Sequence, residues 1–240
     1  MSVVFDTPIL SMTFQATIDN DTVASLPAAR FDGRIIIVDR AEQVEAACDD
    51  LQQYDLIGFD TETRPSFKAG VSHKVSLLQL STPTTCYLFR LNHIRLDNRI
   101  LKLLGSQRVR KVGADVAGDI RSLHALREFR ERGFIDLQHE APRWGIEEKS
   151  LRKLSAIVLG QRVSKAQRLS NWEAGTLTEQ QREYAATDAW VCIRIYEALL
   201  KEAPTREIAP VAPPTAEAKA KSRRHRHHRH KQSKPNNDIG

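Results

Sequence analysis

Three short apolar runs follow one another in the chain with no helical pattern between them: Leu56–Phe59, Val75–Leu80 and Cys86–Phe89. The last two runs are separated only by the turn-rich segment STPTT. Strands joined by so short a connection pair antiparallel, because a parallel pair needs a crossover of a dozen or more residues. The pattern therefore predicts a sheet that begins with antiparallel strands.

Strand and helix patterns alternate around these three runs. Further strands are expected at Arg34–Val38 and Lys111–Gly113, and helices near residues 44–51, 116–123 and 151–158. Thr178 and Gln181 form a capping box that opens the clearest helical segment of the chain. Strands that come first, followed by alternating strands and helices, indicate an α/β fold with a mixed β-sheet flanked by α-helices.

The net charge of +6 is concentrated at the C-terminal end. Nine basic and three acidic residues follow Pro204, and their difference equals the charge of the whole chain. The same segment holds prolines among alanines and then the run SRRHRHHRHKQSK. We expect residues 204–240 to be a Pro/Ala linker with a disordered basic tail. Residues 34–203 then form the folded domain, and residues 1–33 a loosely ordered N-terminal extension.

Cysteine content and hydropathy narrow the class of protein. Cys48, Cys86 and Cys192 are far apart and have apolar neighbours, as is typical of reduced core thiols, so we expect a cytoplasmic protein. The chain has no Cys-x-x-Cys pair, which argues against a thiolate zinc site. No apolar run approaches the roughly 20 residues of a membrane span, and the N-terminus lacks the pattern of a signal peptide.

Two carboxylates stand at the end of the strand that contains IGF. Asp60 and Glu62 are two residues apart, so both project to the same side of the strand. Acids this close repel one another unless a cation lies between them. Oxygen-only ligands favour Mg²⁺ or Mn²⁺ over Zn²⁺. Taken alone, such a pair is more often the solvated start of a loop.

Two further acids and a tyrosine stand on helices. Asp119 lies one turn inside a helix whose N-cap would be Asp115, so capping explains Asp115 but not Asp119. Asp188 follows Tyr184 by four residues and lines up with the apolar stripe of the last helix. That stripe consists of Val191, Cys192, Ile195 and Leu199. An unpaired buried charge is very costly, so Asp188 needs a hydrogen bond, an ion pair or a shared metal.

The segments around these residues resemble the tyrosine-containing (DEDDy) branch of the DEDD superfamily of 3′–5′ exonucleases. The matching segments are IGFDTET with KVSLLQLSTPTTCYLF, then KVGADVAGD, and then SLRKLSAIVLG, KAQRLSNW and LTEQQREYAATDAW. They cover about residues 34–200 in order. Within this branch the chain resembles the Werner syndrome exonuclease domain, and it resembles ribonuclease D more distantly. The resemblance implies a ribonuclease H-like sheet flanked by helices.

The resemblance also implies a site and a reaction. Asp60 and Glu62 match the first motif, Asp119 the second, and Tyr184 and Asp188 the third. Asp60 would bridge two divalent ions, Mg²⁺ or Mn²⁺, about 3.5–4 Å apart. Glu62 and Asp188 would complete the site nearer the nucleophilic water, Asp119 would hold the other ion, and Tyr184 would orient the water. The implied reaction hydrolyses terminal phosphodiesters of nucleic acid and releases nucleoside 5′-monophosphates.

Contacts to a single-stranded 3′ end are expected from residues near the acids, because base stacking and phosphate pairing hold single strands. A solvated loop is an equal alternative for Arg64, Phe67 and Lys68, and a core position is the main expectation for Trp172. The candidate contacts are Thr61, Arg64, Phe67, Lys68, Lys165 and Trp172.

Two other functions fit parts of the chain. One is a noncatalytic nucleic-acid-binding protein whose basic tail neutralises phosphates. The other is metal storage or a metal-chaperone role for the His-rich tail. The four intact acids favour the exonuclease. The sequence does not distinguish DNA from RNA as the substrate, and it identifies no protein partner.

Overall fold

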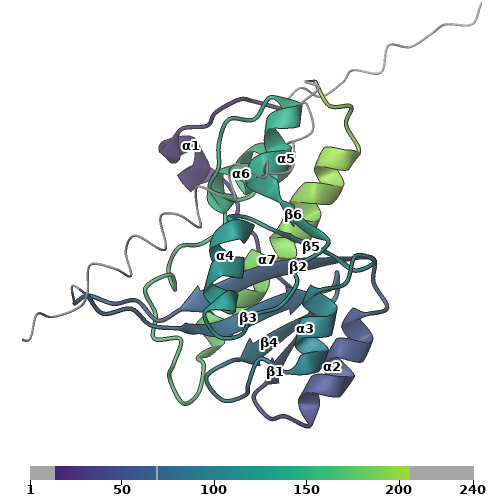
Figure 1. Ribbon diagram of the computed structural model, residues 1–240. Helices are drawn as coiled ribbons and strands as arrows, with labels where there is room; N and C mark the ends of the chain where they lie inside the picture. The colour runs from purple at the N-terminus through teal and green to yellow at the C-terminus, as the bar shows by residue number, and fades with distance from the viewer. Residues whose placement is uncertain (1–13, 69, 206–240) are drawn as a thin grey trace, which may run out of the picture. The chain divides into compact units, whose positions relative to one another are not determined.

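The computed structural model describes residues 14–68 and 70–205, and the expected disordered tail lies almost wholly outside this part of the chain. The described residues build a six-stranded mixed sheet in the order β1-β4-β3-β2-β5-β6 (Figure 1). The strands are β1 (Arg34–Val38), β2 (Leu56–Thr63), β3 (Val75–Ser81), β4 (Thr85–Arg90), β5 (Arg110–Gly113) and β6 (Phe134–Asp136). The strand β3 runs antiparallel to β2 and β4, and the other neighbouring pairs are parallel. The predicted α/β class and the antiparallel start of the sheet are both confirmed.

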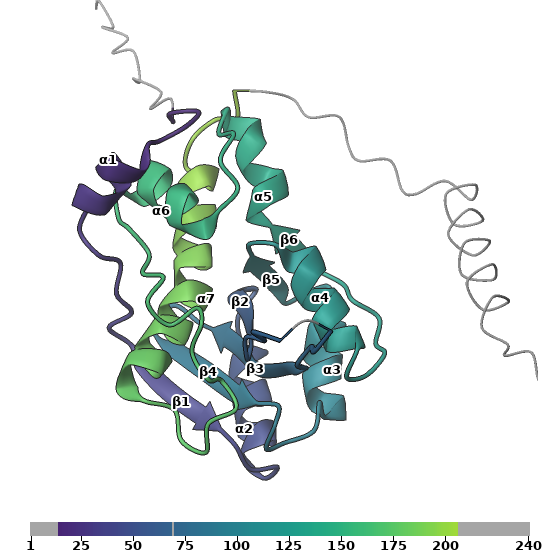
Figure 2. The same ribbon diagram turned by 90° about the vertical axis from the view of Figure 1, so that its left-hand side faces the viewer.

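Helices cover both faces of the sheet (Figure 2). They are α1 (Asn20–Ser25), α2 (Gln43–Leu51), α3 (Asn98–Leu104), α4 (Val116–His124), α5 (Leu137–Glu140), α6 (Leu151–Leu159) and α7 (Glu179–Leu200), with a 3₁₀ turn at Ala141–Trp144. On β3, Leu78 and Leu80 pack with α2 and α3, whereas Leu77 packs with α7. Every residue of β3 and β4 is buried, because both faces of these strands are covered.

The long helix α7 lies very close to the sheet. Its capping box is confirmed: the Thr178 hydroxyl accepts from the Gln181 amide, and the Gln181 side chain accepts from the Thr178 amide. The face toward the sheet includes Ala185 and Ala189, whose small side chains permit the close approach. On β2, Gly58 makes room for it, since a Cβ there would lie 1.9 Å from the Ala189 carbonyl oxygen. The backbone of α7 is thereby fixed against β2.

The described part of the N-terminal extension is not loosely ordered, contrary to the expectation. The Ala29 amide donates to the Arg162 carbonyl at 2.9 Å, and the Arg162 amide donates to the Pro27 carbonyl at 2.9 Å. Phe31 is buried, and its ring centroid lies 5.8 Å from that of Trp190 on α7. These contacts join segments far apart in the sequence, so the weak local periodicity of residues 14–33 gave no sign of them.

The structure also describes the cysteines and the helices to which two of the sequence-based expectations apply. Cys48, Cys86 and Cys192 are free and buried, in agreement with the expected core thiols. None of the described helices combines the length and apolar character needed to cross a membrane.

A buried lysine ties β5 to the loops at its end of the sheet. Lys111 is fully buried, and its ammonium group donates to the carbonyl oxygens of Ser106, Val109 and Arg132 at 2.7, 2.8 and 2.6 Å. It also lies 4.8 Å from the ring centroid of Phe134. Burial lowers the pKa of Lys111 to about 8. The cation is therefore held by neutral carbonyl oxygens rather than by an acid.

Lys111→Met is expected to lower the free energy of unfolding by about 2–4 kcal/mol. Methionine fills much of the same volume, but it leaves several carbonyl oxygens without their donor, and each unsatisfied buried group costs about 1–3 kcal/mol. Urea unfolding followed by circular dichroism measures the change. Lys102→Met, on the exposed side of α3, is the matched control and should stay within about 0.5 kcal/mol of wild type. Equal stability of the two variants would contradict a structural role for Lys111.

Candidate active site

Strand β2 carries the first two acids of the site. It extends to Thr63, so Asp60 and Glu62 lie within the strand rather than beyond its end. Side chains alternate along a strand, so Asp60 and Glu62 lie on the same face of β2 as Gly58, and Thr61 lies on the opposite face. The helix α7 covers the face that contains Gly58. Asp188 on α7 meets them there, and one carboxylate oxygen from each of the three acids lies within 4.8 Å of the others. The structure thus brings together three of the four acids that the sequence singled out.

Asp119 lies beside this group and is held from the other face of β2. Its carboxylate accepts a hydrogen bond from the Thr61 hydroxyl at 2.5 Å. Burial, followed by repulsion from Asp60, raises the pKa of Asp119 to about 8. The Thr61 side chain therefore holds the fourth acid, and its expected contact with substrate stays a prediction. Its hydroxyl is therefore engaged within the protein.

The helix that carries Asp119 begins in an unexpected way. Asp115 occupies the N-cap position in the left-handed region, with φ of 62°, and makes no side-chain capping bond. Capping comes from Asp136 at the end of β6, whose carboxylate accepts from the amides of Asp115 and Val116 at 3.3 and 3.0 Å. A Cβ on Gly118 would lie 2.9 Å from the Asp115 carboxylate. Sequence reasoning assigned the cap to Asp115 and missed Asp136, which is distant in the chain.

The electrostatics of the cluster favour a cation. Burial, followed by repulsion from Asp188, raises the pKa of Asp60 well above its usual range. Burial and then Asp60 raise the pKa of Glu62 to about 10, and burial raises that of Asp188 to about 7. One oxygen of Asp188 is buried and has no hydrogen-bond partner among the described residues. Three close carboxylates, one of which has a buried and unpartnered oxygen, fit Mg²⁺ or Mn²⁺, which take oxygen ligands.

Tyr184 stands at the edge of the acid cluster. Burial, and then the charges of Asp188 and Glu62, raise the pKa of its phenol above the ordinary value, so the hydroxyl remains a hydrogen-bond donor. Trp172 is fully buried, and its ring centroid lies 6.0 Å from that of Tyr184. The core position expected for Trp172 is therefore confirmed, and base stacking by its ring is excluded. Tyr184 thus packs against the buried cluster that contains Trp172.

A cavity of about 300 Å³ opens beside Tyr184 and Asp188. Its other walls come from residues 28–30 of the N-terminal segment and from the loop that follows α6. Arg30 and Glu183 both line the cavity, and the Arg30 guanidinium lies 2.7 Å from the Glu183 carboxylate. Lys165 belongs to the same loop but is exposed and is not among the lining residues. Sequence reasoning missed the N-terminal wall because it treated that segment as separate from the domain.

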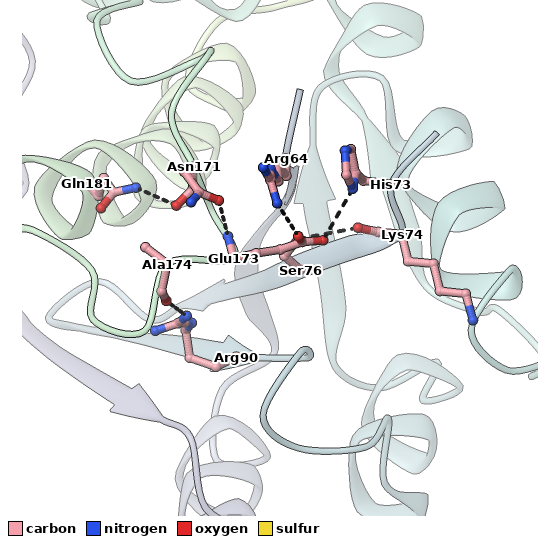
Figure 3. A network of polar contacts seen from close by, with 9 residues as sticks. All are labelled: Arg64, His73, Lys74, Ser76, Arg90, Asn171, Glu173, Ala174 and Gln181. Carbon is pink, nitrogen blue, oxygen red and sulfur yellow. Dashed lines mark hydrogen bonds and ion pairs between the residues drawn. The ribbon is translucent and has the colours of Figure 1, made fainter. Parts of the chain in front are cut away.

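The loop after β2 is joined to the loop before α7. Arg64 and His73 both point toward Glu173 (Figure 3). A guanidinium nitrogen of Arg64 lies 3.2 Å from the Glu173 carboxylate, and Nδ1 of His73 lies 3.7 Å from it. Arg64, a candidate substrate contact, is therefore already paired within the protein. Phe67 is 84% exposed and Lys68 is exposed, and the substrate contacts expected of both stay predictions.

Hydrogen bonds from β4 and from α7 also hold the loop before α7. The buried Arg90 donates to the Ala174 carbonyl (Figure 3). The Gln181 side chain donates to the Ser170 hydroxyl at 2.7 Å and to the Asn171 carbonyl at 3.2 Å. These bonds fix the loop that holds Trp172 and Glu173, and through it they fix the surroundings of Tyr184.

Comparisons with known proteins show the family to which the chain belongs. A family model described as a 3′–5′ exonuclease matches residues 35–204. The chain is 34% identical over 187 residues to the bifunctional 3′–5′ exonuclease/ATP-dependent helicase WRN of Mus musculus. That match covers 73% of this chain and 13% of the mouse protein's length.

Solved structures show the same fold. The Aedes aegypti Nibbler EXO domain superposes with a TM-score of 0.64 at 25% identity, over 70% of this chain and 88% of that one. Escherichia coli RNase D gives a TM-score of 0.64 at 20% identity, over 70% of this chain and 44% of that one. The ribonuclease H-like exonuclease fold and the resemblance to Werner-type and ribonuclease D-type proteins are confirmed. The chain belongs to the 3′–5′ exonuclease family.

Proposed function

We propose that the protein is a metal-dependent enzyme that removes nucleotides from the 3′ end of a nucleic-acid strand and releases nucleoside 5′-monophosphates. The observation that carries the proposal is the convergence of Asp60, Glu62 and Asp188 in one cluster, in which Asp188 is buried and the other two acids are partly buried. Tyr184 and a cavity lie directly beside that cluster. Membership of the 3′–5′ exonuclease family supplies the direction of degradation.

Asp60, Glu62, Asp119 and Asp188 would hold two divalent ions, Mg²⁺ or Mn²⁺. Such ions activate water at neutral pH and neutralise the charge that develops on a phosphodiester. The protein's own part is to keep the carboxylates in place between β2, α4 and α7 and to limit access of bulk water. Tyr184, which stays protonated, donates a hydrogen bond that orients the attacking water and does not act as the base.

Tyr184→Phe is expected to lower kcat by no more than about 10⁴-fold. Groups that position or transfer a proton usually contribute about 10²–10⁴-fold. The metal ligands remain, so the metal affinity should not change. Single-turnover cleavage of a short oligonucleotide measures the effect, with Tyr54→Phe, at the turn before β2, as the control. Full activity of Tyr184→Phe would show that the phenol does not orient the water.

Degradation of matched DNA and RNA strands tests the proposed function. With Mg²⁺ or Mn²⁺ we expect at least one of the two to be shortened, and with a chelator neither. The noncatalytic alternative predicts binding of both strands without any shortening. The same assay compares the two substrates. A faster rate on one strand identifies the preferred nucleic acid, and equal rates would show that the site does not distinguish strands by the 2′-hydroxyl.

The basic tail is proposed to add affinity for nucleic acid without taking part in catalysis. Deleting the residues after Thr205 should weaken binding and flatten its salt dependence, since each lost phosphate contact removes roughly 0.7 from the log–log slope on single strands. Turnover at saturating substrate should persist, because all four acids precede residue 200. Binding of both forms to one oligonucleotide across a salt series measures this. Equal slopes would leave metal binding as the explanation of the His-rich tail.

A further inference from the structure

Gln79, on β3, is a buried amide without a hydrogen-bond partner. Its side chain is fully buried, and among the described residues neither the amide nitrogen nor the amide oxygen is hydrogen-bonded. Most buried polar side-chain atoms in proteins are paired, and leaving such a group unpaired costs about 1–3 kcal/mol. An apolar side chain of the same size would avoid this cost, so the amide at this position calls for a reason.

The register of the sheet places Gln79 directly beside the acid cluster. Gln79 pairs with Asp60 across β2 and β3, and with Leu88 across β3 and β4. Residues directly opposite one another on neighbouring strands point to the same face, with Cβ atoms about 4.5–5.5 Å apart. Leu77, two residues earlier on β3, packs against α7, which confirms the face. The Gln79 side chain therefore lies on the face of the sheet that α7 covers, opposite Asp60 on the neighbouring strand.

We propose that Gln79 is a positioning residue: when the site holds divalent cations, its side-chain amide, unpaired in this structure, would donate a hydrogen bond to the Asp60 carboxylate and fix the orientation of that carboxylate. The inference rests on the proposed function, because it assigns Gln79 a role toward the ions that the four acids would hold. Carboxylates that bind metals are themselves usually hydrogen-bonded by surrounding residues, and loss of such a partner costs 10–100-fold in metal affinity or activity.

The chemistry of the amide suits this role. An ionised carboxylate only accepts hydrogen bonds, and the amide of Gln79 offers two N–H donors. A lysine or arginine at this position would also donate, but its charge would compete with the metal ion for Asp60. A neutral donor orients the carboxylate and leaves its charge available. The cost of burying the amide is then offset when Asp60 is ionised and the site is loaded.

A purely structural role for Gln79 makes the opposite prediction for stability. If the amide served packing alone, its removal would destabilise the metal-free protein and leave the intrinsic metal affinity unchanged. If it orients Asp60, its removal leaves the metal-free protein equally or more stable, because an unsatisfied buried group disappears, while the metal affinity falls.

The test compares full-length wild type with Gln79→Met, which keeps most of the volume and removes the amide. Ser81→Ala is the matched control: Ser81 lies two residues along on the same face of β3, is fully buried, and donates to the Thr82 carbonyl at 2.8 Å. Each protein is titrated with Mn²⁺ in the absence of nucleic acid, and its unfolding by urea is followed with chelator present. The affinities are measured without urea, where all three proteins are folded.

We expect Gln79→Met to bind Mn²⁺ about 10–100-fold more weakly than wild type, with no loss of metal-free stability. Ser81→Ala should lose stability and keep its affinity. Unchanged Mn²⁺ affinity of Gln79→Met would overturn the assignment of Gln79, whatever its stability. Failure of the wild-type protein itself to bind Mn²⁺ would instead contradict the proposed metal-dependent function, so the two ideas fail separately.

Discussion

Replacing Asp60 or Asp188 with alanine is expected to abolish metal-dependent hydrolysis while the protein remains folded. Divalent ions contribute several kcal/mol to such reactions, and each 1.4 kcal/mol corresponds to a tenfold change in rate. The loss should therefore be at least about 10³-fold. The metal-free variants should be as stable as wild type or more stable, because buried acids that repel one another become fewer.

A rate assay and urea unfolding on the same samples check both parts of this prediction. Asp55→Ala is the matched control, since Asp55 directly precedes β2 but its side chain is 76% exposed, and it contacts only Arg108 among the ion pairs of the described residues. This variant should retain its activity. Near-normal Mg²⁺-dependent cleavage by either Asp60→Ala or Asp188→Ala would remove the basis for the site.

Gly58→Ala is expected to have the second large effect, although it changes no charged group. The new Cβ would lie 1.9 Å from the Ala189 carbonyl oxygen and 2.7 Å from its carbonyl carbon. A helix backbone cannot yield locally at such a contact, so α7 must move away from β2 and carry Asp188 with it. Overpacking usually costs about 1–3 kcal/mol and occasionally more, and we expect about 3 kcal/mol together with loss of activity.

Urea unfolding and cleavage rates of Gly58→Ala measure this coupling of fold and site. Gly175→Ala is the control, because a Cβ at Gly175 meets nothing within 4 Å, and its stability should change by no more than about 0.5 kcal/mol. If Gly58→Ala had wild-type stability and activity, the close contact between β2 and α7 would not be what places Asp188 near Asp60.

The parts of the site that local patterns encode could be predicted from the sequence. Alternation along a strand put Asp60 and Glu62 on one face, and helical spacing put Asp188 on the buried stripe of α7. The strands themselves followed from short β-branched and apolar runs. In each case the information lies within a few residues of the group concerned.

The supporting contacts could not be predicted because they join residues far apart in the chain. Asp136 caps α4 from β6, Thr61 holds Asp119 from the opposite side of β2, and Arg30 meets Glu183 on α7. Nothing near these residues in the sequence signals their partners. The close approach of α7 to Gly58 could not be predicted either. A glycine in a strand can mark a bulge, a bend or a close contact, and the sequence does not tell these apart.

The most direct test of the central claim follows one strand end at a time. A single-stranded oligonucleotide labelled at its 5′ end is incubated with the full-length protein and Mg²⁺, and the released small products are identified by mass. Our account predicts a ladder of labelled strands that shorten by single nucleotides from the 3′ end, release of nucleoside 5′-monophosphates, and complete arrest by a chelator. Internal cuts, immediate loss of the 5′ label, or shortening that persists in the chelator would contradict it.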